Sequence, residues 1–162
     1  MILYRMDQQL TRRRLGLILG GLGIGTAHAQ TQKPGTTIHF EVDYKTAAER
    51  IYQALLDAKQ FQALTGLPAE IDPKAGGGFN LFGGQIEGRN VELIPNQRIV
   101  QAWRPTSWAA GIYSIARFEL VPRAPGTRIV FDHAGFTEDK QEHLASGWQQ
   151  NYWEPLHKYL KA

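Results

Sequence analysis

The first ordered pattern in the chain is an alternation of apolar and polar residues over residues 36–44. Four apolar residues fall at every second position: Ile38, Phe40, Val42 and Tyr44. A period of two places such side chains on one face of an extended strand. We therefore predict a half-buried strand whose opposite face, with Glu41 and Asp43, meets solvent.

Helical spacing of apolar residues follows this strand. Thr46, with Glu49 three residues later, has the pattern of a capping box and predicts the start of a helix. A second short helix is predicted over residues 59–64, ending near Gly66.

The middle of the chain predicts a series of strands separated by glycine- and proline-containing turns. Residues 67–74 contain two prolines and indicate a loop or a short edge strand. Further strands are predicted over residues 76–84, 85–94, 98–104, 112–121 and 127–134.

The chain closes with a long amphipathic helix predicted over residues 138–160. Its apolar positions recur at helical spacing and comprise Leu144, Trp148, Tyr152, Pro155, Leu156 and Tyr159. Pro155 removes one backbone donor and should kink the helix. A run of strands followed by a long helix predicts an α+β domain, with the apolar stripe packed on the sheet.

The N-terminal residues have the features of a twin-arginine secretion signal. The arginines at 12–14 precede a glycine-rich apolar run over residues 15–27. That run is shorter than the ~20 residues that a membrane-spanning helix needs. Ala27 and Ala29 provide a small-residue cleavage site. An uncleaved signal anchor is the alternative interpretation.

This interpretation divides the chain into a signal peptide, residues 1–29, a polar tether, residues 30–35, and one domain, residues 36–162. We expect the mature protein to be periplasmic or secreted through the twin-arginine pathway. Once the leader is cleaved, we expect no stable insertion into the membrane.

Charge and cysteine content remove several classes of function. Of 18 basic and 15 acidic residues, four arginines and one aspartate lie in the predicted leader, so the mature domain is formally neutral. This balance argues against nucleic-acid binding, which needs a clustered positive face. The chain has no cysteine, which excludes disulfides and thiolate chemistry. The histidines show no metal-ligand spacing, and we expect neither a metal nor a cofactor.

An ordered set of short motifs resembles the family named for the activator of the 90 kDa heat-shock protein ATPase. The set comprises Phe79, Leu81–Gly84, Ile86 and Gly88, then Glu92–Asn96, Arg98–Val100, Trp103–Arg104, Gly126–Arg128, His133, Gly135–Phe136, Gly147–Trp148, Tyr152–Trp153 and Pro155–Leu156. The resemblance covers essentially the whole predicted mature domain.

That family is part of the START-like, birch-pollen-allergen-like (SRPBCC) superfamily. The resemblance implies a helix-grip fold, in which a curved antiparallel sheet wraps around a long C-terminal helix. It also implies an apolar cavity between sheet and helix, used in the superfamily for hydrophobic molecules. We expect the chain to differ from the eukaryotic co-chaperone in two ways, by lacking its separate N-terminal docking domain and by carrying an export signal.

The candidate binding residues are mostly aromatic, because aromatic side chains give a pocket apolar walls with a few polar groups. The set predicted to bind ligand is Trp103, Trp108, Tyr113, Phe118, Phe131, His133, Trp148 and Tyr152. Plain core packing is the alternative for each of them. Trp108 differs from the rest because it lies in a predicted loop, and the two interpretations are that it covers the cavity entrance or that it packs on the sheet edge.

His133 and Tyr113 are the candidates for catalysis. His133 shares strand parity with Ile129 and Phe131, so on the concave face it would point toward the cavity mouth as a base or a ligand contact. The alternative is a histidine bonded to backbone at the strand end.

Three functions follow from these features. We expect an exported binding protein for a small hydrophobic molecule rather than an enzyme. The first alternative is a cyclase- or hydrolase-like enzyme that uses the same cavity. The second is a co-chaperone-like activator of a heat-shock-protein ATPase.

Overall fold

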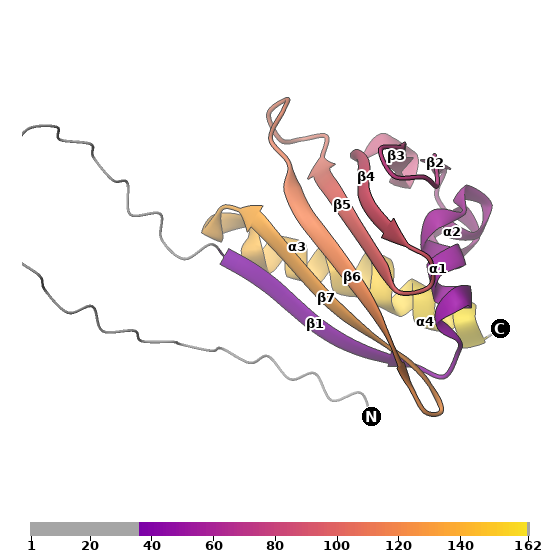
Figure 1. The fold of residues 1–162 in the computed structure, drawn as a ribbon. Helices are drawn as coiled ribbons and strands as arrows, with labels where there is room; N and C mark the ends of the chain where they lie inside the picture. The colour runs from indigo at the N-terminus through magenta and orange to yellow at the C-terminus, as the bar shows by residue number, and fades with distance from the viewer. Residues whose placement is uncertain (1–35, 162) are drawn as a thin grey trace, which may run out of the picture.

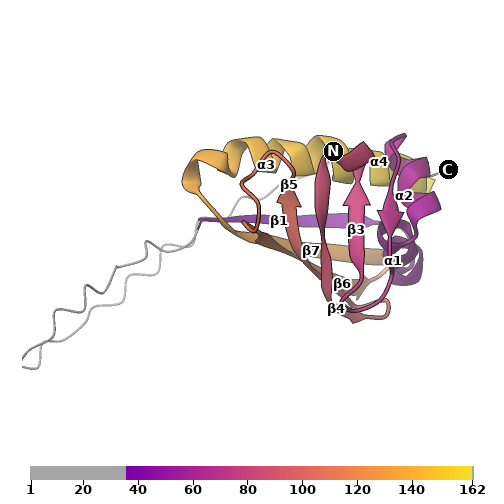
Figure 2. The same cartoon turned by 90° about the horizontal axis from the view of Figure 1, so that it is seen from above.

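The computed structural model describes residues 36–161, which form a seven-stranded antiparallel sheet with the C-terminal helix along one face (Figure 1). The strand order is β1-β7-β6-β5-β4-β3-β2. Turning the molecule shows the helix as a separate layer over the curved sheet (Figure 2). The α+β helix-grip architecture is confirmed. The predicted signal peptide and tether lie outside the described residues.

The strands lie close to the predicted segments. Their bounds are β1 Thr36–Tyr44, β2 Glu70–Ile71, β3 Gly78–Leu81, β4 Ile86–Ile94, β5 Arg98–Pro105, β6 Ser114–Arg123 and β7 Gly126–Phe136. The predicted strand over residues 76–84 is shorter in the structure, because a 3-10 turn, η1 Phe82–Gly84, ends it. The long hairpin of β6 and β7 runs beyond its predicted ends through Pro122 and Gly126.

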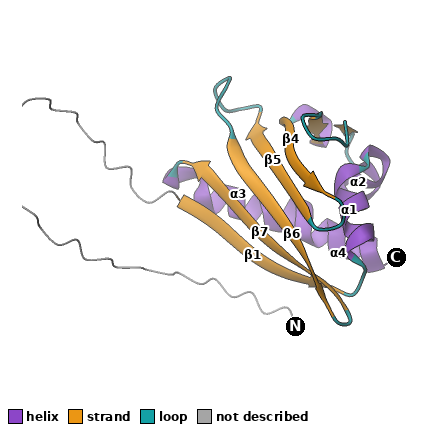
Figure 3. Cartoon of the chain, viewed as in Figure 1, coloured by secondary structure: helices purple, strands orange, loops and turns teal. Residues whose placement is uncertain are grey.

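The helices are α1 Ala48–Leu56 and α2 Ala58–Thr65, then a C-terminal series of η2 Glu138–Lys140, α3 Gln141–Trp148, η3 Gln149–Trp153 and α4 Glu154–Lys161. Helices and strands segregate: α3 and α4 run along one face of the sheet, and α1 and α2 lie at one end of it, beside α4 (Figure 3). No helix among residues 36–161 is both long enough and apolar enough to cross a membrane.

The alternation in β1 sorts side chains as predicted. Ile38, Val42 and Tyr44 are buried against the helix layer, while Glu41 and Asp43 are exposed on the outer face. There, Asp43 accepts two hydrogen bonds of 2.8 Å from Arg128 of β7. These contacts lower the pKa of the Asp43 carboxyl and tie two neighbouring strands on the solvent side.

The predicted capping box is wrong. Helix α1 begins at Ala48 with Ala47 at the N-cap, and no side chain caps it. The Thr46 carbonyl instead accepts a 2.8 Å hydrogen bond from the Thr127 hydroxyl of β7. This long-range bond anchors Thr46 to the start of β7, one residue ahead of the N-cap, so the local pattern is overridden by the sheet.

The C-terminal helix accommodates Pro155 with a π-helical turn, η3. The backbone N–H of Glu154 donates to the carbonyl of Gln149, five residues back. The wider turn lies directly before the proline, which cannot donate a backbone hydrogen bond. It also places both Tyr152 and Trp153 in the core, whereas the predicted stripe contained only Tyr152.

Gly88 of β4 lies where the sheet leaves no room for a side chain. A Cβ there would overlap the Phe79 ring and the carbonyl oxygen of Ala102. Gly147 in α3 differs, because a Cβ there would meet only the Asn151 amide, at 3.8 Å. The same substitution should therefore have opposite effects at the two glycines.

We expect Gly88→Ala to lower the free energy of unfolding by about 1–3 kcal/mol, since overpacking displaces rigid neighbours. Gly147→Ala should raise it by about 0.5–1 kcal/mol, because alanine restricts the unfolded chain in favour of helix. Urea denaturation of both variants against the unchanged protein measures this. Equal effects at the two sites would contradict the packing assigned to Gly88.

Candidate functional site

A cavity of about 360 Å³ lies between the C-terminal helix and one half of the sheet. The helix contributes side chains that recur every three or four residues, from Lys140 to Tyr152. The opposite wall comes from β4, β5 and the turns beside them. The full lining is Leu67, Phe82, Gln85, Ile86, Trp103, Pro105, Thr106, Ser107, Trp108, Lys140, His143, Leu144, Gly147, Trp148, Asn151 and Tyr152.

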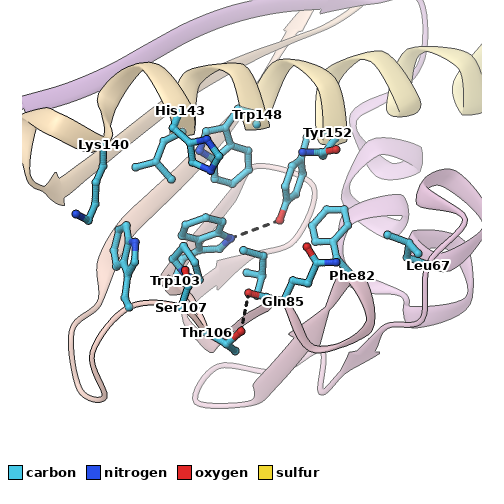
Figure 4. Close-up of a pocket in the computed structure, with 16 residues that line it drawn as sticks. Leu67, Phe82, Gln85, Trp103, Thr106, Ser107, Lys140, His143, Trp148 and Tyr152 are labelled. Atoms are coloured by element: carbon cyan, nitrogen blue, oxygen red, sulfur yellow. Dashed lines mark hydrogen bonds between the residues drawn. The ribbon is translucent and has the colours of Figure 1, made fainter.

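Aromatic rings form the deep wall of this cavity (Figure 4). Trp148 and Tyr152 extend from the helix toward Trp103 of β5, with ring centroids 4.2 Å apart for Trp148 and Tyr152 and 5.3 Å apart for Trp103 and Trp148. The Phe82 ring packs against Tyr152, with ring centroids 5.3 Å apart, and Phe61 of α2 packs against both rings. The wall is flat-sided and apolar, which suits a ring-containing ligand.

The Tyr152 hydroxyl is the polar group of this wall. It accepts a 3.4 Å hydrogen bond from Trp103 Nε1. Burial raises the pKa of the Tyr152 phenol well above its ordinary value, so it keeps its proton at neutral pH. A protonated phenol that already accepts one bond remains able to donate one to a ligand.

Polar side chains line the rest of the cavity without any carboxylate. The six are Gln85, Thr106, Ser107, Lys140, His143 and Asn151. Thr106 donates through its hydroxyl to the carbonyl oxygens of Gly84 and Gln85, at 3.1 and 3.2 Å. This contact joins the turn before β4 to the segment after β5 at one side of the cavity (Figure 4).

Arg104 fixes the loop that carries Trp108. Its guanidinium, with the side chain only 8% exposed, donates to the carbonyl of Ala109 at 2.8 Å and to that of Thr106 at 3.4 Å. The Nε atom lies 3.0 Å from a Glu87 carboxylate oxygen on β4. The loop is therefore held from the outer face of the sheet while Trp108 reaches around to the cavity.

A buried hydrogen-bonded series lies beneath the cavity wall. Trp148 Nε1 donates to His133 Nδ1 at 2.9 Å, which leaves the neutral imidazole its proton on Nε2. His133 Nε2 then donates to Ser114 Oγ at 2.6 Å, and Ser114 donates to the Trp103 carbonyl at 2.8 Å. Burial lowers the pKa of His133 to about 4. Every ring nitrogen is thus occupied by a structural partner.

Residues 45–161 match the family model for Activator of Hsp90 ATPase homolog 1-like protein (AHSA1). The chain belongs to this family. Its helix-grip fold and its cavity lie almost entirely within the matched residues.

The AHSA1 relatives are about a quarter identical to this chain over the matched residues. Activator of 90 kDa heat shock protein ATPase homolog 2 of Mus musculus is 27% identical over 128 residues, which is 79% of this chain and 39% of the relative. Homolog 1 of Homo sapiens is 26% identical over 123 residues, which is 76% of this chain and 36% of the relative. The chain therefore spans less than two fifths of these relatives.

Solved structures reproduce the AHSA1 fold. An HSP90 activator from Plasmodium falciparum superposes with a TM-score of 0.69 at 27% identity, covering 78% of this chain and 96% of that one. CalU16 from Micromonospora echinospora gives 0.68 at 18% identity, covering 78% and 76%. At that lower identity the likeness concerns the fold alone.

Half of the residues predicted to bind ligand line the cavity of this AHSA1 domain: Trp103, Trp108, Trp148 and Tyr152. Phe118 and Phe131 are instead buried in the core, where Phe131 packs on Trp148 with centroids 4.4 Å apart. Tyr113 is 44% exposed and lies beside the Arg104 guanidinium, outside the cavity lining.

His133 does face the concave side, as its strand parity predicted, but it does not reach the cavity mouth. Trp148 and Ser114 take both ring nitrogens, so the imidazole has no free lone pair for a substrate. The backbone-bonded alternative is also wrong, because both partners are side chains. Tyr113 and His133 lie apart from the cavity lining and do not form a joint catalytic site there.

Sequence reasoning missed the polar side of the cavity. Lys140 lies one helical turn before Leu144, so helical spacing from the predicted stripe would have found it, and His143 follows Lys140 by three residues on the same face. Gln85, Thr106 and Ser107 lie in turns, and the sequence does not indicate that these turns fold back to line the cavity. Among residues 36–161, no group of three or more His, Asp or Glu side chains is placed to hold a metal.

The buried neutral His133 predicts a specific dependence of stability on pH. The unfolded chain protonates this histidine near pH 6.5, whereas the folded protein does so only near pH 4. Its contribution is complete above pH 6.5 and is lost as the pH falls toward 4. The size of the shift corresponds to roughly 3 kcal/mol.

We expect His133→Phe to lose most of this dependence, although it also leaves the Trp148 indole unpaired at a cost of about 1–3 kcal/mol. Urea denaturation at pH 7 and pH 4.5 measures the change for each protein. The pKa of His157 is also lowered by burial, so only the difference between the two proteins reports on His133. An identical change in both would contradict the neutral buried state.

Proposed function

We propose that this domain binds a small hydrophobic molecule in the cavity between its C-terminal helix and sheet, after export through the twin-arginine pathway. The observation that carries the proposal is the cavity itself, walled by Trp103, Trp148 and Tyr152. Its volume of about 360 Å³ falls within the range of small-molecule sites, about 300–1,000 Å³. The arginines at 12–14 and the site ending at Ala29 support export.

The packing around the cavity favours a preformed site. Gly147 lies between Leu144 and Trp148 on the helix and contributes no side chain, so space remains beside the indole. The rings that face this space are held by neighbouring aromatics rather than by one another alone. A rigid apolar hollow binds without the entropy loss of ordering its own wall.

The first test is native mass spectrometry of the protein recovered from the periplasm of the cells that express it. We expect a mass that corresponds to cleavage after Ala29 and a further discrete mass that denaturation removes. Protein found only in the cytoplasmic fraction would contradict export, and an intact N-terminus on periplasmic protein would contradict cleavage after Ala29.

The second test fills the cavity. We expect Gly147→Leu to weaken binding of the neutral fluorescent probe N-phenyl-1-naphthylamine at least about tenfold, because the new side chain occupies the ligand space. Gly147→Ala is the matched control and should keep affinity within about twofold. Equal affinity for both variants would place the probe elsewhere, and absence of binding to the unchanged protein would overturn the proposed cavity function.

A second candidate function is activation of a heat-shock-protein ATPase. The observation that favours it is the similarity to relatives named as activators of the 90 kDa heat-shock protein ATPase. The chain covers 32–39% of the length of these relatives, so the activity would have to reside in the part that they share with it.

Steady-state ATP hydrolysis by a purified bacterial homologue of the 90 kDa chaperone tests this candidate. If the domain is an activator, saturating protein should raise the rate severalfold, and Gly147→Leu should raise it equally because a surface contact does not need the cavity. An unchanged rate would contradict activation and leave the binding proposal in place.

A further inference from the structure

The cavity is asymmetric in charge as well as in polarity. Its lining contains a lysine and a histidine but no aspartate or glutamate. Figure 4 shows Lys140 at one end of the cavity and Leu67 and Phe82 at the other. A ligand that fills the space therefore meets apolar rings along its body and a cation at one end.

The Lys140 end of the cavity is open to water, as is the opposite end, where Leu67 is 41% exposed. The Lys140 side chain is 38% exposed, and it lines a second hollow of about 400 Å³ together with Ser107 and Trp108. Ser107, Trp108 and Lys140 line both hollows, so the two hollows share this corner. A charged group placed there keeps part of its hydration while the rest of the molecule is buried.

We infer that the ligand is an amphipathic organic anion, with a flat apolar body and one carboxylate-like group that Lys140 receives. The inference rests on the proposed function of the cavity. His143, one turn along the helix, offers a ring N–H near the same end, and Ser107 offers a hydroxyl. The protonated Tyr152 phenol provides a donor for an acceptor atom on the ligand body.

The acidic residues near Lys140 do not oppose this arrangement. Glu138, Asp139 and Glu142 belong to the same turn, but none of them lines the cavity. Asp139 lies 3.0 Å from the lysine ammonium and is 71% exposed. An ion pair between exposed neighbours contributes little, so a ligand carboxylate can replace Asp139 with little loss.

A matched pair of probes tests the inference on the purified protein. 2-Naphthoate and 2-naphthamide have nearly the same shape, but only the first is an anion. Isothermal titration should show 2-naphthoate binding about five- to tenfold more tightly, as expected for a charge-assisted hydrogen bond in a partly exposed site. Added salt should reduce this preference and leave 2-naphthamide unaffected.

Lys140→Gln should remove the preference by weakening 2-naphthoate alone. Lys158→Gln, on the exposed part of α4 away from the cavity lining, is the matched control and should leave both affinities unchanged. Equal binding of both probes to the unchanged protein, or an undiminished preference in Lys140→Gln, would overturn the inference while the proposed function stands. Failure of both probes to bind would overturn the proposed function, and the inference with it.

Discussion

The hydrogen bond from the Trp148 indole to His133 connects the helix layer to the centre of the sheet, and the rest of the structure is arranged around it. Trp148 lies on the helix and His133 on β7, so a single buried contact joins the two layers. The imidazole is also hydrogen-bonded to Ser114 of β6, and Ser114 in turn donates to the Trp103 carbonyl of β5. Three adjacent strands are thereby linked to one helical side chain.

This arrangement explains why a histidine is used where an apolar side chain would fill the same volume. A buried indole N–H needs an acceptor, and a neutral imidazole supplies one while donating on its other side. The bonds are directional, so they fix the rotation of the helix in a way that apolar contacts alone do not. The cavity depends on that rotation, because Trp148 and Tyr152 form its wall only when they face Trp103.

The parts of the fold that the sequence predicted are those set by local periodicity. The alternation in β1 and the stripe of Leu144, Trp148 and Tyr152 follow directly from burial on one face. The periodic pattern did not predict burial of Trp153, because in the π-turn before Pro155 the backbone N–H bonds to a carbonyl five residues back rather than four. A local pattern does not reveal such a turn, although Pro155 indicated where the helix would depart from regularity.

The candidate site was only half predictable for a related reason. Residues such as Trp103 and Tyr152 could be identified because large aromatics are rare and belong to walls or cores. Whether each lines a cavity or fills a core depends on which chain segment returns over it, and Phe131 shows the second outcome. Arg104 decides this for Trp108, since it holds residues 106–109 around the end of β5. Contacts of this kind join the outer face to the inner one and leave no periodic signal.

Activation of another protein and binding of a small ligand would use different parts of this domain. Activation of another protein requires an outer face, and here the sheet presents paired charges such as Arg128 with Asp43. Ligand binding requires an interior space, which this chain keeps by placing Gly147 beside Trp148 on the helix. A domain that served only as a contact surface would gain stability from a larger residue at that position, because alanine favours helix over glycine and a filled core is better packed. The retained space is therefore the feature that a function confined to the surface does not explain.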